Sequence, residues 1–293
     1  IIKKYIIGDN CNNIIQLCID VLSDKSYKKH IRIKSLNFIS INNHIISDIL
    51  IRYKKDNNLF NMKAYLNSLL TFYIEISKGE ESSYYDKMIV RYKINNILVK
   101  FASLYLNKNN SLLNNISYNN NWNDILNIVF NQQTIMQEIM YHIINDSLSY
   151  FEETISSIKK IETFKKATSY TNILNNEDRI HQQSITIKTY NLYMDSGLEL
   201  LCKLISVNGD KITNINLTKL ITSINFYLYS LLDAKNKNIY NFNFSKYNID
   251  YDWKYLLKQI NEILIVKYNC SDFIETLCNN RDWYDKKLIT KLP

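Results

Sequence analysis

The sequence QQTIMQEIMYHIINDSLSYFEETISSIKKIETF, Gln132–Phe164, predicts one long helix near the middle of the chain. Apolar side chains recur along it at three- and four-residue steps, which is the period of one helix face. That face comprises Met136, Ile139, Met140, Ile143, Ser147, Phe151, Ile155 and Ile158. The triplet Asn145-Asp146-Ser147 interrupts it with short polar side chains, which compete for backbone hydrogen bonds inside helices. Either the helix bends at this triplet, or these side chains bond to a neighbouring helix.

The composition of the chain favours an all-α fold. Its 293 residues include one proline and four glycines, too few for the many turns of a sandwich, a barrel or a doubly wound sheet. A hydrophobic content of 46% is typical of a globular chain. Because successive helical pairs have similar sizes, we expect an elongated, armadillo-like helical solenoid rather than a closed bundle.

Apolar periodicity predicts the positions of the helices. They are expected at residues 12–22, 29–38, 44–53, 59–76, 84–106, 132–164, 177–206, 217–232 and 250–268, with a short helix from Ser271 and a last one over Arg281–Leu292. The second of these helices is expected to carry His30, Arg32 and Lys34 on one side.

Three segments lack helical periodicity. Asn107–Asn123 is rich in asparagine, which predicts an exposed loop or insertion. Lys165–Asn176 is polar and is expected to be a hinge. Lys235–Asn248 contains four aromatic residues, which predict a loop that packs onto the helices.

The formal charge of +8 admits a nucleic-acid or anionic-membrane surface. The lysines are nevertheless interleaved with 28 acidic residues, and no block of five or six like charges occurs. The abundance of Lys, Asn, Ile and Tyr is also what A/T-rich codons supply. We therefore expect neither a nucleic acid nor a membrane as partner. A basic RNA-binding solenoid stays a third class of function, since it needs Lys and Arg along one concave surface.

The residues that could carry chemistry do not form a known motif. There is no Gly-rich phosphate loop, no HExxH and no CxxC pair, so we expect no catalytic residue, no cofactor and no metal site. The cysteines lie in or beside apolar runs, as small core residues do in a reducing compartment. They are Cys11, Cys18, Cys202, Cys270 and Cys278, and the isolated histidines are His30, His44, His142 and His181.

The first residue and the hydropathy of the chain predict its completeness and its relation to membranes. The chain begins at Ile1 without a methionine, so we expect it to be a fragment. It has no signal-peptide pattern, and no apolar run is long enough to span a bilayer.

Several segments, in order, resemble the core of the U-box ubiquitin conjugation factors, which elongate ubiquitin chains. The most specific is LLTFYIEISKGEESSYYDKMIVRYKINNIL at residues 69–98, where an acidic loop precedes a Tyr-Asp-Lys and an Arg-Tyr pair. The central helix is similar through its Ile-Asn-Asp element and the Phe-Glu-Glu that follows. The signature residues are Tyr85, Asp86, Lys87, Arg91, Tyr92, Asn145 and Asp146. Residues 13–40, 177–201 and 271–292 resemble further parts of the same core, but the family's Pro is absent near Lys28.

The resemblance implies that residues 1–293 are the C-terminal part of this core, with the U-box expected after Pro293. In the family the U-box recruits a ubiquitin-conjugating enzyme, and the core acts as a rigid arm. The implied partners are that enzyme, ubiquitinated substrates and a hexameric AAA segregase ATPase, in the cytoplasm and nucleus. The implied function is a scaffold for ubiquitin chain elongation on proteasomal substrates. The alternative is a helical-repeat adaptor without a U-box, and the gene beyond Pro293 separates the two.

The polar triplet of the central helix also has an expected role. Asn145 or Asp146 is predicted to bond to Arg91, Lys87 or Tyr85 of the preceding long helix, because polar residues interrupt both apolar stripes. If no such bond forms, the two polar residues lie on the surface at a helix bend.

Overall fold

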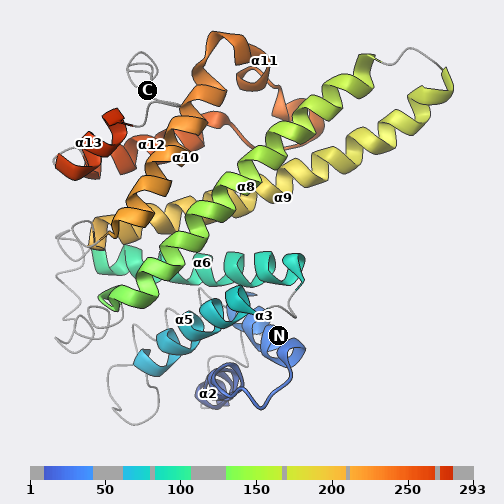
Figure 1. The fold of residues 1–293 in the computed structure, drawn as a ribbon. Helices are drawn as coiled ribbons and strands as arrows, with labels where there is room; N and C mark the ends of the chain where they lie inside the picture. The colour runs from blue at the N-terminus through green and yellow to red at the C-terminus, as the bar shows by residue number, and fades with distance from the viewer. Residues whose placement is uncertain are drawn as a thin grey trace, which may run out of the picture. The chain divides into compact units, whose positions relative to one another are not determined.

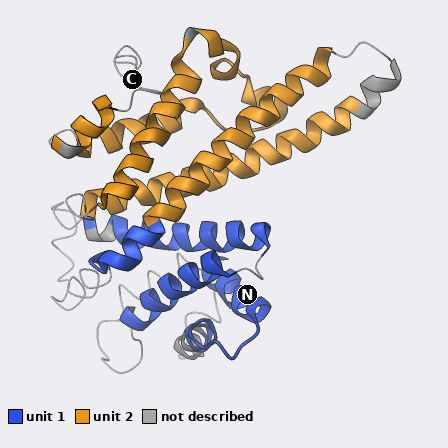
Figure 2. Ribbon diagram, viewed as in Figure 1, with its two compact units in different colours: residues 1–139 blue, residues 140–293 orange. Residues whose placement is uncertain are grey.

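The computed structural model describes residues 10–41, 62–79, 83–106, 130–166, 170–208, 212–267 and 271–279. All regular elements in these ranges are helices (Figure 1). The all-α class is therefore confirmed for the described residues. The chain divides into two compact units, residues 1–139 and 140–293 (Figure 2). The predicted helices at 44–53 and 281–292 and the insertion over Asn107–Asn123 lie outside the described residues.

Unit 1 consists of two helical hairpins and the first turns of a long helix. Its helices are α2 (Asn10–Ser23), α3 (Lys29–Ile41), α5 (Met62–Lys78), α6 (Tyr84–Leu106) and the start of α8 (Gln133–Lys166). The α2–α3 hairpin packs on the α5–α6 hairpin through α2 against α5 and α3 against α6. Stacked hairpins of this kind are consistent with a helical solenoid.

Two polar contacts fix the direction of α3 relative to α6. Lys29 Nζ lies 3.4 Å from Asp86 Oδ2, and Lys93 Nζ donates a hydrogen bond to Asn37 Oδ1. The residue numbers rise together on both helices, so α3 and α6 run parallel, as equivalent helices of adjacent solenoid layers do. Leu36, Leu69, Phe72, Ile97 and Phe101 are among the fully buried residues of this unit.

Unit 2 is built on an antiparallel hairpin of α8 and α9 (Tyr170–Asn208) (Figure 1). The Tyr150 and Tyr190 rings stack with centroids 5.5 Å apart, and Thr154 Oγ1 donates to Asn191 Oδ1 at 3.2 Å. Near the turn, Asn176 Nδ2 donates to the Phe164 carbonyl at 3.1 Å. The predicted hinge over Lys165–Asn176 is therefore wrong for most of its length, because the helix already begins at Tyr170.

The rest of unit 2 packs around this hairpin. It comprises α10 (Asn214–Leu232), η4 (Ala234–Asn236), α11 (Lys237–Tyr240), η5 (Phe244–Tyr247), α12 (Trp253–Lys267) and α13 (Ser271–Asn279). α12 packs against α9, and α10 packs against α11, α12 and α13. The predicted aromatic loop forms the short turns η4 to η5, and its Phe242 and Phe244 are buried.

An aromatic cluster forms the centre of unit 2. Trp253 is 1% exposed and lies edge-on to Phe151, Phe244 and Tyr251 at centroid distances of 5.6, 5.3 and 5.5 Å. Its Nε1 donates a hydrogen bond to the Ile239 carbonyl at 2.9 Å. The buried indole thus has both apolar contacts and a partner for its one donor, and it ties α11 to α12.

Candidate functional site

The signature residues at the start of α6 lie at the edge of unit 1. Ser83 Oγ accepts a hydrogen bond from the Asp86 amide at 3.1 Å, and the Ser83 carbonyl accepts one from the Lys87 amide, so Ser83 caps the helix. The Asp86 carboxylate, in the first turn of the helix, pairs with Lys29. Tyr85 is 64% exposed. This part of the signature forms the first turn of α6 and joins that helix to α3. Tyr85 stays at the surface.

Arg91, one turn and a half further along α6, is buried. Its Nε donates to Ser77 Oγ of α5 at 2.9 Å, and its guanidinium lies 6.0 Å from the centroid of the Tyr73 ring. Ser77 Oγ in turn donates to the Tyr73 carbonyl at 2.7 Å. Arg91 therefore joins the two helices of one hairpin, which is a structural role within unit 1.

The polar triplet of the central helix lies in an uninterrupted part of α8. Ser147 is buried, and Asn145 Oδ1 accepts a hydrogen bond from Lys219 Nζ of α10 at 3.1 Å. Of the two explanations for the triplet, bonding to a neighbouring helix is confirmed for Asn145, although its partner Lys219 is not one of the three that were predicted. A bond from Asp146 to Arg91 joins residues of different units and stays a prediction. A double-mutant cycle of Asp146→Ala with Arg91→Ala tests it.

Arg32 is a second buried arginine, and the sequence pattern does not predict its burial. Arg32 of α3 is 4% exposed, whereas His30 and Lys34 are exposed. The expectation that all three share one side is wrong, because residues two apart on a helix point in opposite directions. An arginine within a run of exposed basic residues carries no sequence signal of burial, so only the structure identifies it.

Arg32 joins α2, α3 and α5 through its whole guanidinium. Nε and Nη2 donate to the Leu22 carbonyl at the end of α2, at 3.0 and 2.7 Å. Nη1 and Nη2 bind the Glu75 carboxylate at 2.6 and 3.2 Å, and the Phe72 ring lies beneath the guanidinium with its centroid 4.4 Å away. A forked pair of this kind fixes both distance and orientation. It also occupies a helix-end carbonyl that has no partner within its own helix.

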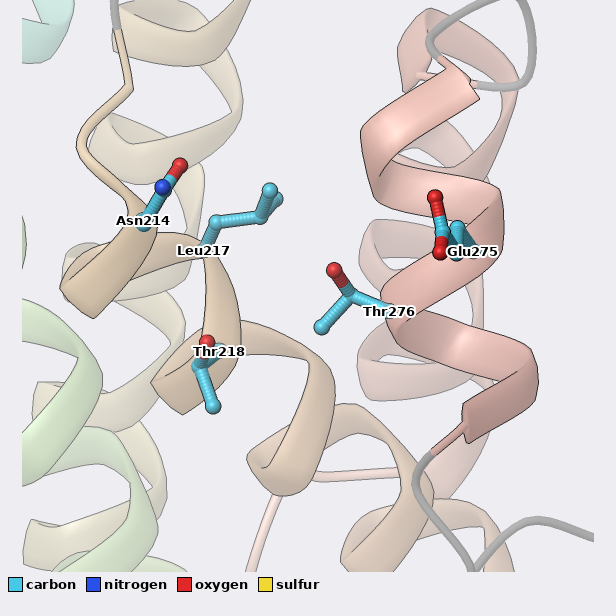
Figure 3. Close-up of a pocket in the computed structure, with 5 residues that line it drawn as sticks. All are labelled: Asn214, Leu217, Thr218, Glu275 and Thr276. Atoms are coloured by element: carbon cyan, nitrogen blue, oxygen red, sulfur yellow. The ribbon is translucent and has the colours of Figure 1, made fainter.

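A small cavity lies between α10 and α13 (Figure 3). It measures about 250 Å³ and is lined by Asn214, Leu217, Thr218, Glu275 and Thr276. Thr276 points from α13 toward α10, and Leu217 forms part of the opposite wall (Figure 3). Glu275 is the single ionisable residue of this lining, so the cavity does not bring an acid and a base together.

Two further observations concern the chemistry of the described residues. No group of three His, Cys, Asp or Glu side chains among them is placed to hold a metal ion. Cys18 is half-buried, Cys202 is buried and Cys278 is exposed, all three as free thiols. The expectation that every cysteine is a core residue is therefore wrong for Cys278.

Comparison of the whole sequence with known protein families decides which family the chain belongs to. The family described as the ubiquitin elongating factor core matches residues 2–292. The chain belongs to the ubiquitin elongating factor core family. Every signature residue falls within the matched range, so the resemblance found on short motifs extends over nearly the whole chain. No curated protein matches the chain.

Three basic residues of the elongating factor core thus lie at junctions between helices. Arg32, Arg91 and Lys219 each hold two or more helices together from a buried or half-buried position. Among the described helices, none is both long enough and apolar enough to cross a membrane.

Proposed function

We propose that this core is the scaffold of a U-box ubiquitin ligase that extends ubiquitin chains on substrates and thereby marks them for proteasomal degradation. The observation that carries the proposal is the family match over residues 2–292. The bonded junctions inside each unit support it, because a scaffold presents its partners at fixed positions only when its own helices are fixed.

In this proposal the chemistry belongs to the partners. A U-box positions the ubiquitin-charged conjugating enzyme, while the helical core binds ubiquitinated substrate and a hexameric AAA segregase ATPase. The ligase works in the cytoplasm and nucleus. Chain growth then depends on how the core orients an acceptor ubiquitin, which is catalysis by positioning.

The second candidate is a helical-repeat adaptor that retains this core and has no U-box. It would bind the same ubiquitinated proteins without extending their chains. The absence of an acid–base pair from the cavity between α10 and α13 suits the ligase and the adaptor equally. Only an activity measurement separates them.

The test is a chain-assembly reaction on the full-length gene product, with and without whatever follows Pro293. It contains ubiquitin, activating and conjugating enzymes and a monoubiquitinated substrate. The ligase predicts long chains with the full-length protein and none without the extension, while substrate binding is unchanged. Lys258→Ala, on the exposed face of α12, is the control and should elongate as well as the unmodified protein. Binding without elongation by the full-length protein would favour the adaptor.

A further inference from the structure

The first turns of α10 hold a cation against α8 at a half-exposed position. Lys219 Nζ donates a hydrogen bond to Asn145 Oδ1 at 3.1 Å and lies 4.1 Å from the centroid of the Tyr141 ring. Tyr141 and Asn145 lie one turn apart on α8, within unit 2. Because two side chains already position the ammonium, a ligand that binds it loses less affinity to the ordering of this lysine.

The charge of Lys219 is not neutralised by its surroundings. Lys219 is the single charged residue of α10, whose sequence is NINLTKLITSINFYLYSLL. Within the described ranges, no carboxylate forms an ion pair with it. Glu138, about one turn before Tyr141 on α8, is instead paired with Lys78 of α5 at 2.7 Å. A cation whose partners are polar but uncharged attracts a carboxylate from outside.

The two partners of Lys219 place further hydrogen-bond donors beside the cation. Asn145 uses its carbonyl oxygen to accept from Lys219, which leaves its amide N–H groups as donors for other acceptors. Hydrogen bonding and charge from Lys219, and after them the Asn145 amide, lower the pKa of the Tyr141 hydroxyl. Groups that favour the ionised phenol are donors toward its oxygen. Since Tyr141 is 38% exposed, its own proton is free to meet an acceptor from solvent.

An exposed apolar side chain lies beside this group of donors. Ile215 is 68% exposed and lies four residues before Lys219, so the two side chains are neighbours on one face of α10. A single exposed isoleucine is ordinary at a protein surface. Next to a held cation, however, it offers an apolar contact to the residue that flanks an acidic side chain. The pair therefore favours a peptide over a small inorganic anion.

We propose that Lys219, Asn145 and Tyr141 form a docking site for an acidic peptide segment of a partner protein. A Glu or Asp carboxylate of that segment accepts hydrogen bonds from Lys219 Nζ and the Tyr141 hydroxyl, and an apolar side chain next to it packs on Ile215. Asn145 holds the ammonium in place from within the protein. The site gives this signature residue a role in binding, and it does not depend on chain elongation, since it needs neither a U-box nor a conjugating enzyme.

NMR titration of the full chain with the peptide acetyl-Leu-Glu-Asp-Leu-Glu-Asp-amide measures the binding. The same peptide with Gln and Asn in place of Glu and Asp is the neutral control ligand. We expect shifts grouped on Tyr141, Asn145 and Lys219, and about tenfold weaker binding of the neutral peptide. Higher salt should weaken the binding of the acidic peptide. Because a bound carboxylate opposes the charge of Lys219, the pKa of Tyr141 should rise in the complex.

Lys219→Met and Lys258→Met compare two lysines of unit 2. Lys219→Met keeps the aliphatic stem and should weaken binding of the acidic peptide about tenfold. Lys258→Met, at an exposed position of α12, should bind as the unmodified protein does. Tyr141→Phe keeps the ring under the ammonium, so it stays folded, and it should weaken binding about two- to fivefold.

Three results would overturn the site. One is equal binding of the acidic and neutral peptides, and another is equal binding by Lys219→Met and Lys258→Met, which would mean attraction to net charge alone. The third is tighter binding of an oligouridylate of the same charge than of the acidic peptide, which would assign the surface to nucleic acid. Far-UV circular dichroism of each variant checks that a loss of binding is not a loss of the helical fold.

Discussion

Lys219 of α10 donates a hydrogen bond to Asn145 of α8 at 3.1 Å, and the same ammonium lies 4.1 Å from the centroid of the Tyr141 ring. One cation thus bonds to a family signature residue and packs on an aromatic face one turn before it. The hydrogen bonding and the charge of Lys219 lower the pKa of the Tyr141 hydroxyl, with a smaller effect from Asn145. The contact joins α8 to α10 within unit 2.

Lys219→Met removes the hydrogen bond and the cation–π contact but keeps the aliphatic stem. We expect the free energy of unfolding to fall by about 0.5–1.5 kcal/mol, since the site is partly open to water. The pKa of Tyr141 should rise toward its usual value, which NMR of the Tyr ring detects. Lys258→Met, at an exposed position of α12, is the control. A double-mutant cycle with Asn145→Ala that gives no coupling energy would contradict the contact.

Arg32→Ala should strongly destabilise unit 1. It leaves the Leu22 carbonyl and the Glu75 carboxylate without their shared partner. We expect a loss of about 2–4 kcal/mol, which is moderated because Glu75 stays one-third exposed to water. Urea unfolding, with hydrogen exchange of the α2, α3 and α5 amides, measures the loss.

Arg32→Lys distinguishes the forked geometry from the charge alone. A lysine cannot bind Leu22 and Glu75 with two parallel N–H groups, so most of the loss should persist. Lys34→Ala, exposed on the same helix, should change stability by less than about 0.5 kcal/mol. Full stability in Arg32→Lys would show that charge alone is sufficient.

The sequence predicts those helices whose apolar stripes are complete. α6 begins and ends at the predicted residues, Tyr84 and Leu106, because its stripe runs without a gap. α9 begins at Tyr170 rather than at Glu177, since its first two turns are polar and have no stripe. The bond from Asn176 to the Phe164 carbonyl supplies a tertiary contact there that periodicity cannot report.

The side-chain bonds that join neighbouring helices are less predictable from the sequence than the helices themselves. The polar triplet around Asn145 interrupts an apolar stripe and is visible in the sequence, but its partner Lys219 lies 74 residues further along the chain. Nothing in the local pattern marks Lys219 or Arg32 among the other basic residues. Burial of an isolated charge depends on which helix ends and carboxylates surround it, and that is decided by packing rather than by local sequence.

Trp253→Phe and Trp253→Ala separate the two contributions of the aromatic cluster. Phenylalanine keeps most of the ring contacts but loses the bond to the Ile239 carbonyl, so we expect a cost of about 1–3 kcal/mol. Alanine also empties a fully buried site, which should cost about 3–5 kcal/mol. Thermal unfolding measures both, with exposed Tyr255→Ala as control. Equal losses in the two Trp253 variants would mean that the hydrogen bond, and not ring packing, is decisive.

The cysteines provide a test of unit 2 that needs no change in the sequence. Burial, with the nearby Glu262 and Glu199 charges adding to it, raises the pKa of the Cys202 thiol to about 12. Thiolates are the reactive species, so Cys202 should alkylate at pH 8 at least about a hundredfold more slowly than exposed Cys278. Mass spectrometry of iodoacetamide-treated native protein measures both rates, and unfolding in urea should make them equal. Rapid native labelling of Cys202 would mean that α12 does not cover this part of α9.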